Sequence, residues 1–202
     1  MQVFRQIPLY RFLSICNKEC SGKKILDCGA GGNQPPLSLF QEYGYDTSGI
    51  EIDEIKIKEA KKFAESQHQS LNIITGDMMN LPFSEQEFDA VYSYNSIFHM
   101  KKIDIEKSIK EIKRVLKKDG LLFVNFLSTD DFMCDLGIEL GNKEFEQEEE
   151  GKVIHAYYED NEADEYFNDM LLIHKEKRIV ERKFEGEFVK QGYIDYIVQK
   201  LT

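Results

Sequence analysis

Short apolar runs alternate with longer amphipathic stretches along the first 127 residues of the chain. Residues 24–28 form an apolar run that leads into glycines, which indicates a buried strand followed by a turn. Comparable runs at 47–52, 71–75, 88–93 and 121–127 predict four more strands. The last run is apolar throughout, as expected of a strand that is buried on both faces.

Helical periodicity fills the spaces between these predicted strands. Two prolines at 35–36 suit the first turn of a helix that is expected to end near Tyr43, with Gly44 as its left-handed stop. Asp53 is expected to cap the next helix. A third, strongly amphipathic helix is expected to run up to Gly120. An order of strand, helix, strand, helix is typical of a doubly wound parallel sheet.

The alternation stops after residue 127. Residues 128–151 are expected to be irregular, with the acidic run at 146–150 in a solvated loop or at a helix end. Beyond this region, the sequence predicts a strand at 153–158 and a helix at 161–170. This part of the chain therefore does not continue the strand and helix pattern of the first part.

The two ends of the chain carry patterns of their own. Two long strands are predicted at 171–182 and 193–200, with a turn near Gly186. Because no helix separates them, we expect them to pair antiparallel at one edge of the sheet. Residues 1–20 predict a helical arm, whose apolar side chains either cover a ligand or cap the sheet.

Composition narrows the class of protein. The chain is 42% hydrophobic and 31% charged, as in soluble globular proteins. No apolar run approaches the ~18 residues of a membrane-spanning helix, and the first residues lack the pattern of a signal peptide. We therefore expect a cytoplasmic protein without membrane contact. Four cysteines are scattered with no Cys-x-x-Cys pair, which predicts reduced thiols and no metal site.

The net negative charge of the chain indicates which classes of substrate it is able to bind. The net charge is −11, from 26 basic and 37 acidic residues, and such a charge disfavours binding to a phosphate backbone. Lysine clusters at 58–62 and 110–118 lie within helical patterns, where solvated helix faces explain them. A nucleic-acid partner is therefore not expected, and a small, neutral or cationic acceptor is favoured. The sequence does not indicate an oligomeric state.

A glycine-rich loop, Asp27-Cys28-Gly29-Ala30-Gly31-Gly32-Asn33, follows the first predicted strand. Such a loop lets the backbone approach a ligand at the carboxyl end of a strand. Counted from Gly29, the dinucleotide fingerprint needs a glycine at position 34, where Gln34 stands, so NAD and FAD are disfavoured. At the end of the second predicted strand, Glu51 is able to accept hydrogen bonds from both hydroxyls of a ribose.

Five motifs in order resemble the class I S-adenosylmethionine-dependent methyltransferases, especially the small-molecule branch similar to enzymes of ubiquinone and menaquinone biosynthesis. The motifs lie at 25–31, 49–52, 76–83, 88–99 and 116–120 and cover about half of the chain. The resemblance implies an α/β, Rossmann-like, doubly wound and mostly parallel seven-stranded sheet in the order 3-2-1-4-5-7-6, with strand seven antiparallel at the edge. The helix entry departs from the family, because Asn33, Gln34 and two prolines stand where many members have a further glycine.

The resemblance also implies a cofactor site for S-adenosylmethionine. The expected cofactor-binding residues are Asp27, Gly29, Gly31, Glu51, Ile52, Asp77, Met78 and Tyr94. Asp27 and the glycine loop would hold the methionine part, and Glu51 would hold the ribose. Ile52 would lie beside the adenine, and Asp77 would accept from its exocyclic amine.

The acceptor side of the site is expected at two segments. In this family the loop after the fourth strand faces the methyl group, and here it carries Asn95 and His99. His99 is the candidate catalytic base, because an ordinary histidine pKa of ~6.5 suits neutral pH; the alternative is that it packs at the helix start. His155 and Tyr157 are further substrate-pocket candidates that share one face of a predicted strand, unless that strand is a half-buried edge.

These features predict an S-adenosylmethionine-dependent methyltransferase that moves a methyl group in line to a small-molecule acceptor. One domain is expected over 1–202, with the arm at 1–20, a cofactor-binding core at 24–127 and a variable substrate side with a terminal hairpin at 128–202. Two alternatives stay open. One is an S-adenosylmethionine-binding protein without transferase activity, and the other is a dinucleotide-dependent oxidoreductase.

Overall fold

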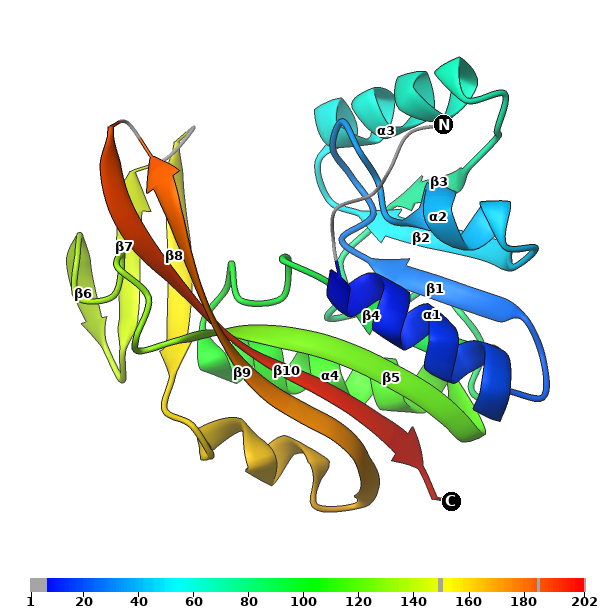
Figure 1. Cartoon of the computed structure of the whole chain (residues 1–202). Helices are drawn as coiled ribbons and strands as arrows, with labels where there is room; N and C mark the ends of the chain where they lie inside the picture. Colours follow the sequence, from blue (N-terminus) through cyan, green and yellow to red (C-terminus); the bar gives the residue numbers. More distant parts are fainter. Residues whose placement is uncertain (1–6, 149–150, 185, 202) are drawn as a thin grey trace.

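The computed structural model describes residues 7–148, 151–184 and 186–201 (Figure 1). Its elements in chain order are α1 (Ile7–Glu19), β1 (Lys24–Cys28), α2 (Leu37–Glu42), β2 (Asp46–Glu51), α3 (Glu54–Ser66), β3 (Asn72–Thr75), β4 (Phe88–Ser93), α4 (Lys102–Val115), β5 (Leu116–Ser128), β6 (Ile138–Gly141), β7 (Glu144–Glu148), β8 (Lys152–Tyr158), the 3₁₀ helix η1 (Glu162–Phe167), β9 (Met170–Phe184) and β10 (Glu187–Lys200). None of the helices in the described part is long and apolar enough to cross a membrane.

The main sheet has the order β3-β2-β1-β4-β5-β10-β9. The strands from β3 to β5 run parallel, whereas β10 is antiparallel to both of its neighbours, β5 and β9. This is the expected order, with the last strand of the chain inserted second from the edge. The prediction of a doubly wound sheet with an antiparallel terminal pair is confirmed.

Each face of the sheet has its own core, because side chains alternate along the strands. Phe12 and Leu13 of α1 are buried on one face together with Ile25 and Phe123. On the other face, the apolar stripe of α4 packs against the alternate residues of β1, β4 and β5. Figure 1 shows α1 and α4 on opposite sides of these strands. The arm therefore caps the sheet; its residues 1–6 lie outside the described part.

A second, smaller group of strands extends the sheet beyond the end of β5. β8 pairs parallel with β5 over two residues only, and β7 and β6 follow it as an antiparallel meander. The expectation that 128–151 is irregular is therefore wrong, since β6 and β7 lie within it. Glu146 belongs to β7 and not to a loop, whereas residues 149–150 lie outside the described part. The pattern was hard to see because one inward position of β7 is a glutamine, Gln147.

Two predicted helix ends are also corrected. α4 ends at Val115, where Leu116 turns to extended backbone and pairs with Phe88, so the helix stops five residues before Gly120. Leu116 is buried in the same core as the apolar stripe of α4, so the helical spacing of apolar residues continues past the end of the helix. The helix expected at 161–170 is the shorter 3₁₀ helix η1. The left-handed Gly44, with φ of 77°, and the cap at Asp53 are confirmed.

Candidate functional site

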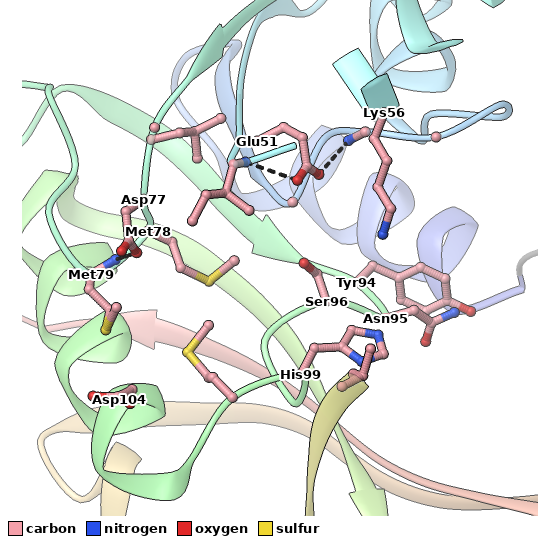
Figure 2. A pocket seen from close by; sticks show the side chains of 18 of the residues that line it. Glu51, Lys56, Asp77, Met78, Met79, Tyr94, Asn95, Ser96, His99 and Asp104 are labelled. Atoms are coloured by element: carbon pink, nitrogen blue, oxygen red, sulfur yellow. Dashed lines mark hydrogen bonds between the residues drawn. The ribbon is translucent and has the colours of Figure 1, made fainter. Parts of the chain in front are cut away.

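A cavity of ≈ 820 Å³ opens at the carboxyl ends of the parallel strands (Figure 2). Its walls come from the glycine loop after β1, the end of β2, the loop after β3, the loop after β4 with the start of α4, and the start of β8. Open α/β sheets bind ligands at this edge, beside the strand where the winding direction changes. The cavity is in the size range of small-molecule and cofactor sites.

Seven of the eight predicted cofactor-binding residues line this cavity. They are Gly29, Gly31, Glu51, Ile52, Asp77, Met78 and Tyr94. They come from four different strand ends, so the sheet topology brings them together over a sequence distance of 65 residues. The exception, Asp27, is described below.

The glycine loop touches the loop after β4. Gly29 has φ of +104°, and a Cβ atom there would lie 2.0 Å from Oγ and 2.4 Å from Cβ of Ser96. The backbone N–H groups of Gly29 and Ala30 both donate to the carbonyl oxygen of Ile50, at 2.9 and 3.0 Å. These contacts close the loop tightly against β2 and β4, and only glycine fits at position 29.

The carboxylate of Glu51 is held at the cavity wall by backbone donors. Its Oε1 accepts from the N–H groups of Ile52 at 2.9 Å and Asp53 at 3.0 Å, and its Oε2 accepts from Gly31 at 3.1 Å. Figure 2 shows this carboxylate between the glycine loop and α3. Three bonds leave part of its acceptor capacity unused. A Cβ atom on Gly31 would lie 2.6 Å from Oε2, so the approach of loop and carboxylate also requires glycine.

Asp77 and Met78 form the opposite side of this half of the cavity. The Oδ1 of Asp77 accepts from the N–H of Met79 at 2.8 Å, a local turn that fixes the side chain. The preceding Gly76 donates its N–H to the carbonyl oxygen of Glu51 at 2.9 Å. Figure 2 shows Asp77 and Met78 across the cavity from His99.

The loop after β4 is anchored by a pair of asparagines that the sequence did not single out as a pair. Asn95 has φ of 53°, and its N–H donates to Oδ1 of Asn125 at 2.8 Å. In return, Nδ2 of Asn125 donates to Oδ1 of Asn95 at 2.7 Å. Asn125 is fully buried in β5. The available signal was one polar residue within the otherwise apolar run at 121–127.

His99 and Tyr94 lie on the wall beside this anchored loop. The His99 ring is reached by solvent from the cavity, but the protein atoms around it desolvate it, and this lowers its pKa to about 3. A positive charge on His155 and the ammonium group of Lys56 act in the same direction. Burial raises the pKa of Tyr94 above its usual value. At neutral pH both side chains are therefore uncharged.

Asp27 lies behind the glycine loop and not on the cavity wall. Its side chain is 1% exposed, and its Oδ2 has no hydrogen-bond partner in the described part of the chain. Burial raises the pKa of Asp27 to about 8, with a smaller contribution from the charge of Glu51. Its predicted contact with the methionine part of a cofactor stays a prediction.

The structure does not bring His155 and Tyr157 to the wall. They do share one face of β8, but that strand lies between β5 and β7 and is not a half-buried edge. Both side chains are buried and contact Gln147. The preceding segment 152–154 lines the cavity in their place.

Comparison with known sequences identifies relatives of the first part of the chain. Residues 26–124 match the family model described as "Methyltransferase domain". The chain is 34% identical over 132 residues to sterol 24-C-methyltransferase ERG6B of Gibberella zeae, covering 60% of this chain and 34% of that protein. It is 29% identical over 126 residues to the uncharacterized methyltransferase YcgJ of Bacillus subtilis, and this match covers 61% of this chain and 49% of that protein. The chain thus spans about a third to a half of these curated relatives.

Comparison with solved structures covers nearly the whole chain. An S-adenosylmethionine-dependent methyltransferase from Clostridium acetobutylicum superposes with a TM-score of 0.74 at 15% identity, covering 100% of this chain and 94% of that one. TehB from Haemophilus influenzae superposes with a TM-score of 0.73 at 17% identity, and the match covers 98% of this chain and 63% of that one. At these identities the structures show a shared fold, which includes β6 to β10 as well as the matched core.

Proposed function

We propose that the chain is a class I S-adenosylmethionine-dependent methyltransferase, which binds S-adenosylmethionine in this cavity and transfers the methyl group to a small-molecule acceptor. The observation that carries the proposal is the placement of Glu51, whose carboxylate three backbone N–H groups hold beside the glycine loop. The family match and the shared fold support it. The ubiquinone and menaquinone branch stays a prediction.

The residues present fit the cofactor. Gly29 and Gly31 let Ser96 and Glu51 approach the loop backbone at the cavity wall, because their side-chain atoms lie 2.0 and 2.6 Å from the Cβ positions. Glu51 keeps acceptor capacity for ribose hydroxyls, and Asp77 has one carboxylate oxygen, Oδ2, outside its local turn. Met78 adds an adaptable apolar surface for an aromatic base.

When bound, the cofactor supplies an electrophilic methyl group on a sulfonium centre, so the protein mainly orients the reactants. The anchored loop after β4 would hold the acceptor against that methyl group through Asn95, Ser96 and His99. A base with a pKa of about 3 holds a proton poorly at neutral pH. We therefore assign His99 an orienting role and not that of a strong general base.

The remaining wall suggests the kind of acceptor. Met100, Val153 and Ile154 give this half of the cavity an apolar lining. The whole lining carries three lysines and three carboxylates, so its formal net charge is zero. A small molecule with an apolar body fits this wall, and neither a nucleic acid nor a membrane is part of the proposal. The names of the curated relatives, which include sterol C-methyltransferases and O-methyltransferases, also support a small-molecule acceptor.

We propose that residues 1–202 form one methyltransferase domain, and the sheet that runs from β1 to β10 supports this. A cytoplasmic location also belongs to the proposal, since all four cysteines are free thiols.

Calorimetric titration of the full chain with S-adenosylmethionine, S-adenosylhomocysteine and NAD tests the proposal. We expect both sulfur compounds to bind and to raise the melting temperature, as a ligand specific for the native state does. Transfer of labelled methyl groups to a panel of small hydroxyl, thiol, amine and alkene compounds would then identify the acceptor class. Binding of NAD without any response to S-adenosylhomocysteine would contradict the proposal.

A further inference from the structure

Gln147 of β7 is a buried side chain whose four hydrogen-bonding positions are all used. Its Nε2 donates to the carbonyl oxygens of Met133 at 2.7 Å and Leu136 at 2.9 Å. Its Oε1 contacts Nδ1 of His155 at 2.6 Å and the hydroxyl of Tyr157 at 3.1 Å. The reverse orientation of the amide would place Oε1 against two carbonyl oxygens, where no hydrogen is present. The amide orientation is therefore fixed.

This fixed amide determines where His155 carries its hydrogen. Oε1 of Gln147 has no hydrogen to give, so Nδ1 of His155 must be the donor at 2.6 Å. A neutral His155 is then the Nδ1–H tautomer, and Nε2 is the nitrogen that titrates. The side chain is 4% exposed, and such burial disfavours its charged form.

His155 is packed directly against His99 on the cavity wall. The two ring centres are 4.7 Å apart, and Phe98 lies 4.7 Å from His99 and 6.2 Å from His155. The backbone supports this arrangement, because the N–H of Ala156 donates to the carbonyl oxygen of Phe98 at 3.0 Å. The two imidazoles are thus held together by strand β8 and the loop after β4.

Charged groups from two elements of the described part of the chain act on this pair. Lys56 of α3 faces His99, and Figure 2 shows its side chain reaching from the helix toward His99 and Asn95. Asp131, in the loop after β5, faces His155 and favours its charged form. Two backbone N–H groups already occupy Asp131, from Met133 at 2.9 Å and Gly192 at 3.0 Å. The burial of His155 and the positive charge of Lys56 both disfavour protonation of the histidine pair.

We infer that Gln147 and His155 are positioning residues that hold His99 as a neutral imidazole beside the sulfonium centre of the bound cofactor. The inference rests on the proposed function, because the sulfonium position follows from the cofactor site. A second positive charge at His99 or His155 would repel the sulfonium group. S-adenosylhomocysteine has no sulfonium charge, so the ratio of the two affinities reports the charge of this histidine pair.

The tautomer is measured on the wild-type chain without any ligand. The chain has only four histidines, so variants His68→Gln and His174→Gln, at positions outside the cavity lining, help assign the imidazole signals in long-range ¹H–¹⁵N spectra. We expect His155 to show hydrogen on Nδ1, and His99 to remain neutral from pH 8 to 5.5. Hydrogen on Nε2 of a neutral His155, or protonation of His99 in this range, would overturn the inference.

The second test compares Gln147→Glu with the matched control Gln147→Met. Both variants lose the two donated hydrogen bonds, but only glutamate places a carboxylate beside Nδ1 and thereby favours the protonated form of His155 as the pH falls. For Gln147→Glu, we expect the affinity for S-adenosylmethionine to fall about tenfold relative to S-adenosylhomocysteine between pH 8 and 5.5. In the wild type, Gln147→Met and His155→Phe, the ratio should change less than about twofold.

The outcomes separate this inference from the proposed function. Failure of the wild type to bind either compound would overturn the proposed function, and the tautomer measurement would still decide the part played by Gln147. Binding of both compounds with a wild-type ratio that falls tenfold on acidification would overturn this inference alone. If the Gln147 variants do not fold, the wild-type ratio and spectra remain decisive.

Discussion

Asn95 and Asn125 exchange hydrogen bonds between the loop after β4 and the interior of β5. The amide of Asn125 both accepts from the backbone N–H of Asn95, at 2.8 Å, and donates to its side chain, at 2.7 Å. This pair fixes Asn95 in the left-handed region, where asparagine is tolerated better than most residues. The loop that carries Ser96 and His99 is therefore set by one buried side chain of the neighbouring strand.

Replacement of Asn125 by leucine should destabilise the protein and loosen this loop. The change leaves the N–H of Asn95 without its partner, which costs about 1–3 kcal/mol in the free energy of unfolding. Denaturant unfolding measures this loss. Asn95→Gly is the matched control, because glycine keeps the positive φ and the N–H bond and loses only the side-chain bond. An Asn125→Leu protein as stable as Asn95→Gly would show that the backbone bond contributes little.

Glu51→Gln should weaken binding of S-adenosylhomocysteine without unfolding the protein. Hydrogen bonds to a charged group contribute about 1.5–3 kcal/mol each, so loss of part of two such bonds lowers affinity roughly tenfold to a hundredfold. Calorimetry measures the affinity, and Glu54→Gln on the exposed side of α3 is the control. An unchanged affinity in a folded Glu51→Gln protein would mean that the ribose binds elsewhere.

The strands and motifs of the first part were predictable because buried parallel strands read as apolar runs. The positions of Gly29 and Glu51 followed from their place at strand ends. The role of Asn125 was not predictable, because it depends on β5 lying next to the loop after β4. β7 was missed for a different reason, since Gln147 is polar and yet buried, and its partners come from two other segments. Contacts between distant segments carry no local pattern.

Gly29→Ala should destabilise the protein more than Gly32→Ala does. Both glycines have positive φ, at +104° and +94°, so both changes impose a similar backbone strain. A Cβ atom at position 32 meets nothing within 4 Å, whereas at position 29 it meets Ser96. Denaturant unfolding of the two variants isolates the clash, and Gly29→Ala combined with Ser96→Gly should recover much of the difference. Equal losses of stability in the two single variants would show that the glycine loop and the loop after β4 move apart at little cost.

Asp27 should make the stability of the free protein fall as pH rises from about 4 to 8. Its pKa is raised from 3.8 to about 8 by burial, so within this window the folded chain keeps a proton that the unfolded chain has lost. Stability then decreases with pH, by at most about 1.4 kcal/mol per pH unit for one proton. Asp27→Asn keeps the shape of the protonated carboxyl and removes the titration. Urea unfolding at pH 5, 6, 7 and 8 measures the free energy of unfolding, which should depend less on pH for Asp27→Asn than for the wild type. The stability of the variant relative to the wild type should therefore increase toward pH 8. Parallel profiles for the two proteins would show that Asp27 is ionised in the folded chain.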